Sequence, residues 1–344
     1  MGGRRRPGRV RDFSPAGTRG HRTDPATLAI PRLAKRLLLL ALVAGAGPPA
    51  AAAEPLRPVA QIRRVVLISI DGLRPDLLLR AHTPALHRLM DQGAFSMWAQ
   101  TTAESVTLPS HVSMLTGVPP STHGITWNDD RVLTPPVYPA RPTLFELARR
   151  AGYTTAMVAG KSKFSTLRKP GTLDWSYVPR TKVVSDRVVT DAALTLIDSH
   201  RPDVLFVHLP GVDTAGHAHG WGSGAQLAAI ATADSCVGTL IAALRSRGLL
   251  DSTVIVVTAD HGGAGKSHGP NDPRSRHIPW IAAGPGVRPN FDLTTDAGLT
   301  IRTEDTFATI CWLLAIPVPE PVEGRPVTEA MSIGPRSSHS AARR

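Results

Sequence analysis

The sequence VIVVTADHGG at residues 254–263 decides the fold class, because it joins an uninterrupted apolar run to a group of polar and flexible residues. A β-branched run of this length, without polar alternation, is typical of a strand buried on both faces of a parallel sheet. Such sheets carry their functional groups just beyond the carboxyl ends of the strands. We therefore expect Asp260 and His261 at such an edge, where Gly262 and Gly263 allow a sharp turn and a close approach to a ligand.

Two other apolar runs end in the same way. Residues 64–70 (RVVLISI) lead directly to Asp71, and residues 203–209 (DVLFVHL) lead to Asp213 and His217. This pattern, repeated with intervening helical segments, predicts an α/β fold with a doubly wound, mostly parallel sheet sandwiched by helices. Further strands are expected at 153–159 and 278–284, and helices at 84–91, 109–117, 143–150, 185–199, 224–247 and 303–314.

The net charge of +12 is concentrated at the amino terminus. Residues 1–36 contain ten Lys or Arg and two Asp, so they hold eight of the twelve charges, and the composition does not predict a nucleic-acid partner. A basic segment, a short apolar core and a small-residue cleavage region at 37–53 follow the pattern of a secretory signal. We expect export to the periplasm or the extracellular space. An uncleaved anchor is the alternative, but the apolar run is short for a stable membrane span.

We expect four segments along the chain. A disordered basic extension covers 1–36, the signal core and cleavage region 37–53, one catalytic domain 62–330 and a frayed tail 331–344. Cys236 and Cys311 are too few to form a thiolate zinc site, and a disulfide between them is left open. The sequence also leaves the oligomeric state open.

Six potential metal ligands are expected at one edge of the sheet. Three carboxylates and three imidazoles are the ligand types of zinc and similar divalent ions. Six ligands exceed what one tetrahedral ion with an open position needs. They suit two ions about 4 Å apart, which stabilise the attacking and leaving oxygens of a phosphoryl transfer. The six residues are Asp71, Asp213, His217, Asp260, His261 and His268.

These motifs resemble those of the alkaline phosphatase superfamily, and within it the type I phosphodiesterase/nucleotide pyrophosphatase family, over about residues 62–330. The resemblance implies two divalent metal ions, zinc by preference. It also implies a nucleophile, Thr107, that forms a phosphothreonine intermediate. On local sequence alone, a helix cap is the favoured interpretation of Thr107, just ahead of the helix expected from Pro109. The implied ligand sets are Asp71, Thr107, Asp260 and His261 for one ion, and Asp213, His217 and His268 for the other.

Three further residues are candidates for binding the substrate phosphate. Asn128 lies 21 residues after Thr107, at the offset of the family's phosphate-binding asparagine. Lys161 and Lys163 resemble a Lys-x-Arg pair that binds phosphate in some monoesterases of the superfamily, with lysine in place of arginine. An ordinary solvated turn is the alternative interpretation of each segment.

His277 is an alternative candidate for the third histidine ligand. We favour His268, because it lies in the glycine-rich loop, whereas His277 directly precedes a buried strand. His111, His123, His208 and His219 are assigned supporting roles by default. The segment at 107–111 also overlays the sulfatase signature. A sulfatase would need Cys or Ser at its first position and Arg at its fifth, and Thr107 and His111 stand there instead.

The sequence thus predicts a two-metal hydrolase whose substrate is a small phosphodiester or nucleotide pyrophosphate. A phosphomonoesterase and a phosphoalcohol transferase are the alternatives that use the same residues. A binding protein without activity would be expected to lack a ligand or the nucleophile, and none is missing.

Overall fold

The computed structural model describes residues 56–130, 133–180, 183–318 and 321–332. The basic extension, the signal-like segment and the tail from residue 333 onward, all predicted from the sequence, lie outside the described residues.

An eight-stranded sheet forms the centre of the described domain, and the predicted α/β fold with a mostly parallel sheet is confirmed. Only β7 runs against its neighbours in the described sheet, so the strand expected at 278–284 is antiparallel. Three strands were not predicted, namely β2, β4 and β8. In sheet order the strands are β4 (Trp175–Tyr177), β3 (Thr155–Ala159), β5 (Val204–Leu209), β1 (Arg64–Ile70), β6 (Thr253–Thr258), β7 (His277–Ala283), β2 (Gly93–Gln100) and β8 (Phe291–Asp292).

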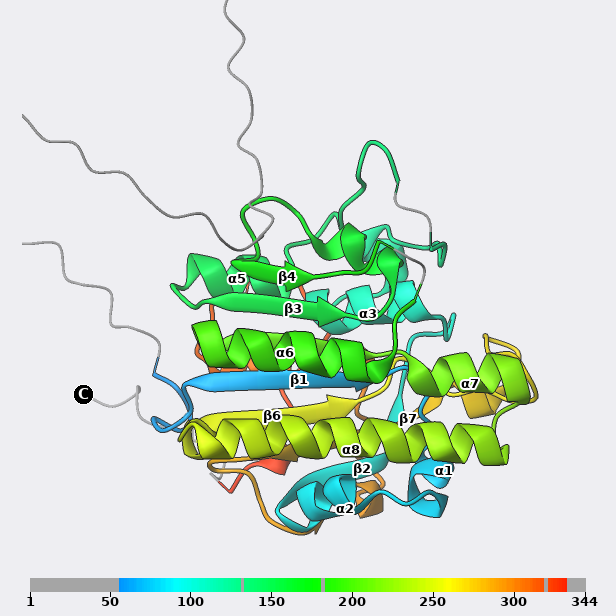
Figure 1. The fold of residues 1–344 in the computed structure, drawn as a ribbon. Helices are drawn as coiled ribbons and strands as arrows, with labels where there is room; N and C mark the ends of the chain where they lie inside the picture. Colours follow the sequence, from blue (N-terminus) through cyan, green and yellow to red (C-terminus); the bar gives the residue numbers. More distant parts are fainter. Residues whose placement is uncertain (1–55, 131–132, 181–182, 319–320, 333–344) are drawn as a thin grey trace, which may run out of the picture. The chain divides into compact units, whose positions relative to one another are not determined.

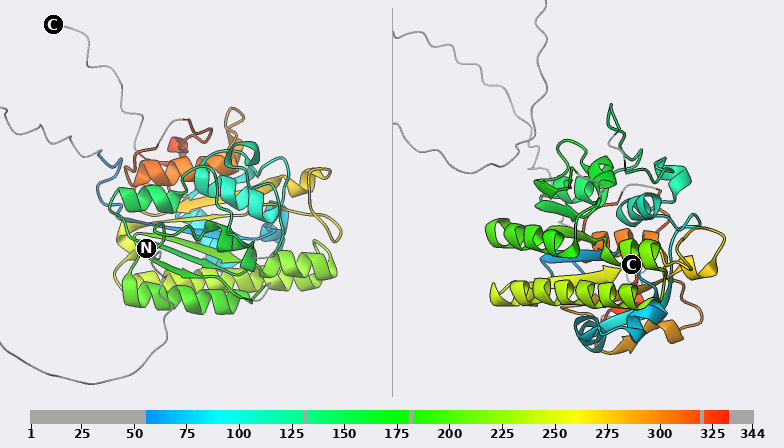
Figure 2. Two further views of the ribbon diagram at one scale, coloured as in Figure 1. Left: turned by 90° about the horizontal axis from the view of Figure 1, so that it is seen from above. Right: turned by 45° about the vertical axis from the view of Figure 1, so that its right-hand side comes forward.

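Helices cover both faces of the sheet (Figure 2). One layer contains α3, α5 and α9, and the opposite layer contains α6 and α8, with α2 beside α8. Every residue of β5 and β6 is buried between these layers. Each fully buried Val, Leu or Ile stabilises the fold by roughly 1.5–3 kcal/mol relative to an exposed one. The helices are α1 (Pro75–Arg80), α2 (Pro84–Asp91), α3 (Thr107–Thr116), α4 (Pro120–His123), α5 (Leu144–Arg150), α6 (Asp186–His200), α7 (Gly211–His219), α8 (Gly224–Ser246) and α9 (Thr303–Leu313).

Helix α3 begins two residues earlier than expected. Val106 is its N-cap and Thr107 its first residue, so Pro109 occupies the third position rather than opening the helix. Proline is tolerated there, because N–H groups in the first turn have no intrahelical partner. The helix ends, as predicted, at Gly117, which adopts a left-handed conformation with φ of 72°. The loop expected after it contains the short helix α4.

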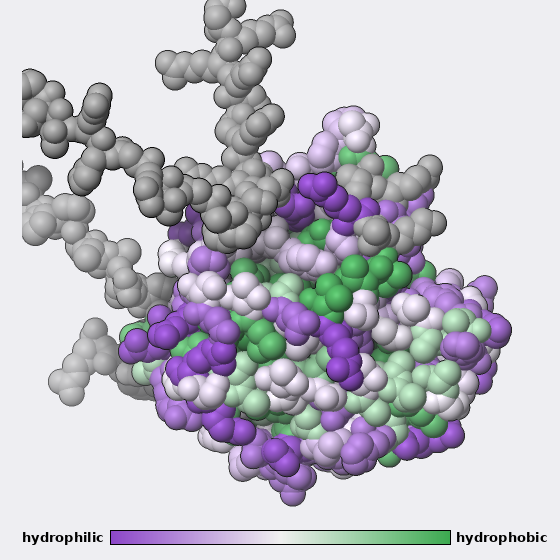
Figure 3. Space-filling view, viewed as in Figure 1, coloured by the Kyte–Doolittle hydropathy of each residue, from purple (hydrophilic) through white to green (hydrophobic). Residues whose placement is uncertain are grey.

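Helix α8 is the one helix in the described ranges that is long and apolar enough in composition to cross a membrane. It packs against α2, α6 and α7, and 44% of its most apolar window is buried. Figure 3 shows weakly hydrophobic side chains over this layer, interspersed with hydrophilic ones. These properties are also those of a core helix of a globular domain.

The carboxyl ends of β5, β1 and β6 lie side by side at one edge of the sheet, as the arrowheads of β1 and β6 show in Figure 1 and as the pairing of β5 with β1 requires. The strands are parallel and in register there, with Ser69 opposite both His208 and Thr258. Whatever follows these three strands is therefore brought to one place.

Candidate active site

Three buried aspartates meet at this edge. Asp71 directly follows β1, Asp213 lies in the first turn of α7 after β5, and Asp260 lies two residues beyond β6. Each side chain is at most 4% exposed. The backbone N–H of Gly72 donates to Asp260 Oδ1 over 3.1 Å, which ties the ends of β1 and β6 together. The convergence expected from the parallel topology is therefore present.

A first group forms around His261. Its Nδ1 donates to the carbonyl oxygen of Gly262 over 2.8 Å, so the neutral ring presents the lone pair of Nε2. This nitrogen lies 3.4 Å from Asp71 Oδ1 and 3.3 Å from Asp260 Oδ2. Neither oxygen has a hydrogen-bond partner within the described residues. Burial, with His268 nearby, lowers the pKa of His261 to about 4, so the ring is neutral near neutral pH. Burial and the neighbouring charge of Asp71 raise the pKa of Asp260 well above its usual value, so a cation is needed to keep both carboxylates ionised.

A second group forms around Asp213. Its Oδ1 is buried and lacks a hydrogen-bond partner in the described part of the chain. It faces Nε2 of His217 at 3.2 Å and Nε2 of His268 at 3.8 Å. Both rings donate Nδ1–H to backbone carbonyls, of Lys266 over 3.0 Å and of Ser105 over 2.8 Å. Two imidazole Nε2 atoms thus converge on one carboxylate oxygen. The contact with Asp213 raises the pKa of His217, whereas burial lowers the pKa of His268.

The two groups adjoin each other. The rings of His261 and His268 stack with centroids 3.7 Å apart, and ligand atoms of Asp71, Asp213 and His261 lie within 4.8 Å of one another. Orphaned carboxylate oxygens that face imidazole lone pairs need positive charge, so these residues fit a pair of divalent cations. His277, the rival ligand, stacks on Trp98 at 3.7 Å and has no place in either group.

Thr107 lies against the first group. Its hydroxyl Oγ1 is 3.2 Å from His261 Nε2, and the residue is 1% exposed. It is the first residue of α3 rather than its N-cap, so the capping role favoured on local sequence is wrong. The turn before it includes Ser105, whose φ of 50° is unusual for a residue other than glycine and whose carbonyl orients His268.

Asn128 and Lys163 form one unit at the start of α3. Asn128 Oδ1 accepts from the backbone N–H of Leu108 over 3.0 Å and from Lys163 Nζ over 2.9 Å. Lys163 also donates to the carbonyl oxygen of Asn128 over 3.1 Å and faces Asp130 at 3.4 Å. These contacts orient the asparagine amide, so Lys163 acts on Asn128 rather than projecting freely into the site.

Lys161 lies between the two groups. Its Nζ is 2.7 Å from Asp71 Oδ2 and 2.6 Å from Asp213 Oδ2. Lys161 therefore contacts the Oδ2 atom of each carboxylate, whereas the Oδ1 atoms face the histidines. Burial opposes its charge, but Asp71 and Asp213 outweigh burial and raise the pKa of Lys161 above its usual value. The sequence did not indicate that this lysine joins two of the predicted ligands.

His208 supports Asp71 from inside β5. Its Nδ1 accepts from the backbone N–H of Gly160 over 3.2 Å, so Nε2 carries the proton and donates to Asp71 Oδ2 over 2.8 Å. Burial lowers the pKa of His208, which keeps the ring neutral. The only indication of this role in the sequence was that His208 is a single histidine within an apolar strand.

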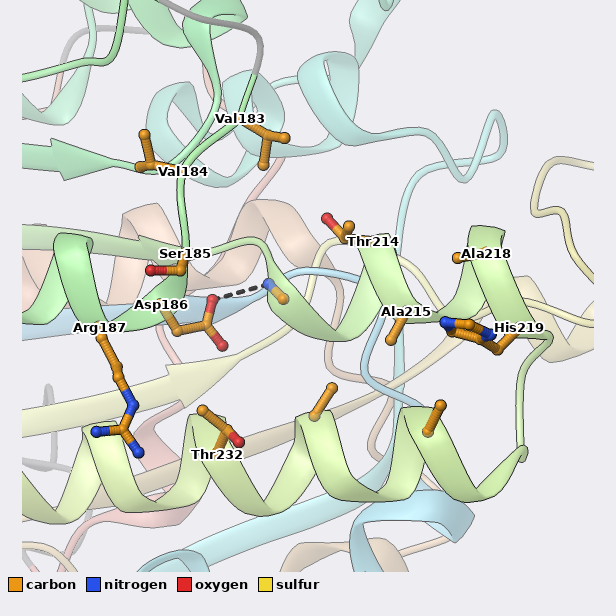
Figure 4. Close-up of a pocket in the computed structure, with 13 residues that line it drawn as sticks. Val183, Val184, Ser185, Asp186, Arg187, Thr214, Ala215, Ala218, His219 and Thr232 are labelled. Atoms are coloured by element: carbon orange, nitrogen blue, oxygen red, sulfur yellow. Dashed lines mark hydrogen bonds between the residues drawn. The ribbon is translucent and has the colours of Figure 1, made fainter.

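A groove of about 570 Å³ lies on the reverse side of α7 (Figure 4). It opens between α7, α8 and the start of α6, and none of the seven predicted metal ligands lines it. At its inner end, Asp186 Oδ1 accepts from the backbone N–H of Gly211 over 2.8 Å. Asp186 thereby fixes the start of the helix that carries Asp213.

Replacing Asp186 with asparagine is expected to stabilise the metal-free protein at high pH. Burial raises the pKa of Asp186 from 3.8 to about 6. The folded state thus retains a proton that the unfolded chain releases, and wild-type stability falls as pH rises from about 4 to about 6. The stability gain of D186N over wild type should grow by roughly 2–3 kcal/mol between about pH 4 and about pH 8. Urea unfolding with a chelator measures this. The exposed Asp191→Asn on the same helix is the control, and an equal pH dependence there would contradict the interpretation.

A family model described as type I phosphodiesterase/nucleotide pyrophosphatase matches residues 65–270, which is more than half of the chain. An uncharacterized pyrophosphatase/phosphodiesterase of Schizosaccharomyces pombe is 29% identical over 216 residues, which cover 58% of this chain and 44% of that protein. Ectonucleotide pyrophosphatase/phosphodiesterase family member 3 of Bos taurus is 26% identical over 221 residues, which cover 58% of this chain and 24% of that protein. The chain thus matches less than half the length of these relatives.

Solved structures share the fold. Murine ectonucleotide pyrophosphatase/phosphodiesterase 5, in an inactive form with AMP, aligns with a TM-score of 0.66 and 16% identity, and the alignment covers 78% of this chain and all of that one. A 2-O glycosaminoglycan sulfatase aligns with a TM-score of 0.62 and 16% identity, over 78% of this chain and 74% of that one. At this identity the likeness concerns the fold alone.

Proposed function

Because the chain belongs to the type I phosphodiesterase/nucleotide pyrophosphatase family, we propose that it hydrolyses a small phosphodiester or nucleotide pyrophosphate at two divalent cations. The observation that carries this proposal is the pairing of three orphaned carboxylate oxygens with three histidine lone pairs beside a buried threonine hydroxyl. One ion would be held by Asp71, Thr107, Asp260 and His261, and the other by Asp213, His217 and His268.

Bound cations, zinc by preference for these ligands, would neutralise the phosphoryl oxygens and lower the pKa of the attacking hydroxyl. Thr107 Oγ1 then attacks phosphorus and breaks the bond to the leaving group, which takes up the proton that the hydroxyl lost. The phosphothreonine formed from a diester or pyrophosphate still carries the remaining substituent of the substrate on phosphorus. Water hydrolyses this ester and restores the threonine. Burial of Thr107 excludes bulk solvent from the reacting oxygen.

Asn128 and Lys161 are proposed to bind the phosphoryl group. Since Asn128 Oδ1 accepts from Leu108 and Lys163, its Nδ2 carries the N–H groups available to a substrate oxygen. In the described part of the chain, Asp71 and Asp213 engage two of the three Lys161 donors, and the third serves the substrate. Lys163, which the sequence placed in the same role, acts by holding Asn128.

A phosphomonoesterase is the second candidate, and one observation favours it. Lys161 adds a buried positive charge next to both proposed cation sites, which suits a dianionic phosphate better than a singly charged diester. A phosphoalcohol transferase would use the same groups with an alcohol in place of water.

Three substrates distinguish these candidates. The zinc-loaded protein is expected to hydrolyse bis-p-nitrophenyl phosphate and a nucleotide pyrophosphate faster than p-nitrophenyl phosphate, and a chelator should abolish all three activities. Hydrolysis of the monoester alone would overturn the diesterase assignment. Hydrolysis that survives thorough chelation would overturn the two-cation assignment.

We also propose that the protein is exported. The relatives carry the names of ectonucleotide and venom enzymes, and the segment at 37–53 has a signal-like sequence. Cell fractionation tests this, since a full-length protein retained in the cytoplasm would contradict export.

A further inference from the structure

Trp221 lies in the short connection between α7 and α8 and links the segments that hold both ligand groups. Its backbone N–H donates to the carbonyl oxygen of Gly265 over 2.7 Å. Its indole N–H donates to the carbonyl oxygen of Gly72 over 2.9 Å. The residue is 9% exposed, and its ring contacts both α7 and the turns after β1 and β6. One residue thus joins the turn after β1 to the loop after β6.

The indole ring fills space that three glycines leave open. These glycines are Gly72, next to Asp71, Gly216, next to His217, and Gly263, two residues after His261. A Cβ atom added to them would lie 3.2, 2.8 and 2.4 Å from the ring, respectively. The ring therefore sets how closely the segments carrying these ligands approach one another.

The same ring contacts two of the predicted ligands directly. It meets the His217 ring edge to face, with centroids 5.3 Å apart, and the His268 ring at 6.0 Å. Each histidine donates Nδ1–H to a backbone carbonyl, and packing against the ring limits rotation about that hydrogen bond. Trp221 supplies this packing on the side of the second group.

We propose that Trp221 is a positioning residue that sets the cation affinity of the second group, formed by Asp213, His217 and His268. This inference rests on the proposed two-cation function. Trp221 carries no metal-binding atom. Its proposed role is to set the spacing between the ligands on α7 and the ligand in the loop after β6. Groups that orient metal ligands typically change metal affinity by 10–100-fold when they are replaced.

Zinc titration of the metal-free protein by calorimetry tests the proposal. The wild type is expected to bind two ions, and His217→Ala should remove the binding event of the second group. Trp221→Phe should weaken that same event by about 10- to 100-fold, and more than it weakens the other event. Trp280→Phe is the matched control, because Trp280 is also buried and its indole N–H donates to Thr306 Oγ1 of α9 over 3.2 Å, in the opposite helix layer.

A second variant separates positioning from general loss of folding. Gly216→Ala keeps Trp221 but places a methyl group against the ring, and it should weaken the same binding event. Gly224→Ala, where an added Cβ meets nothing within 4 Å, should not. Circular dichroism checks that each variant is folded.

The outcomes are distinct. Two ions bound with wild-type affinity by folded W221F would overturn the role of Trp221, as would an equal loss in W280F. A wild-type protein that binds fewer than two ions would instead overturn the proposed function.

Discussion

Replacing Thr107 with alanine is expected to reduce turnover by ~10⁴-fold or more, because the variant lacks the oxygen that attacks phosphorus. The hydroxyl lies 3.2 Å from His261 Nε2 at the first residue of α3. Its removal deletes one small polar group, so the fold should persist. Steady-state hydrolysis of bis-p-nitrophenyl phosphate measures the loss. Mass spectrometry of acid-quenched enzyme should detect a threonine that carries a nitrophenyl phosphate group in the wild type only.

Two variants make this result specific. Thr107→Ser keeps a hydroxyl and should retain measurable turnover. Thr116→Ala removes a buried hydroxyl at the other end of α3, where it donates to the carbonyl oxygen of Val112 one turn earlier, and should leave turnover nearly unchanged. More than about a tenth of wild-type turnover in T107A would exclude Thr107 as the nucleophile.

Replacing Lys161 with methionine is expected to destabilise the metal-free protein by roughly 3–5 kcal/mol. Lys161 is the cation that contacts both Asp71 and Asp213 within the described residues, and both carboxylates are buried. Its removal leaves their charges uncompensated in a medium of low polarity. Urea unfolding with a chelator measures the effect.

Zinc should restore much of the stability lost in K161M, because a cation that binds the folded state neutralises the two carboxylates in place of Lys161. The matched control is Lys169→Met, which breaks an exposed pair with Glu146 and should change the free energy of unfolding by at most about 1 kcal/mol. Equal metal-free stability of K161M and wild type would show that Lys161 does not balance these carboxylates.

The central strands were predictable because burial on both faces leaves a continuous apolar run. β1 has the bounds expected from RVVLISI, and β6 differs by one residue at its start. β2 carries the sequence GAFSMWAQ, in which small, polar and apolar residues mix around a register shift, and it lacks such a run. β4 and β8 have three and two residues, too few for any periodicity.

The candidate site was predictable as far as strand topology determines it. Parallel strands bring Asp71, Asp213 and Asp260 to one edge whatever the details of packing. The contacts of Lys161 and Trp221 depend instead on side-chain packing between distant loops, which no local pattern encodes. The start of α3 was predicted at the wrong residue. Proline is common at the first position of a helix, and the sequence alone does not show that Pro109 occupies the third position instead.

The three histidines that face the orphaned carboxylates are all oriented by main-chain oxygen atoms, those of Ser105, Gly262 and Lys266. Every amino acid supplies the same carbonyl group, so mutational drift at position 266, where the side chain is exposed, can replace Lys266 without changing the tautomer of the His217 ring. Evolutionary constraint should therefore act on the path of the backbone there, and tolerance of many side chains but not of proline is the expected pattern in a saturation library.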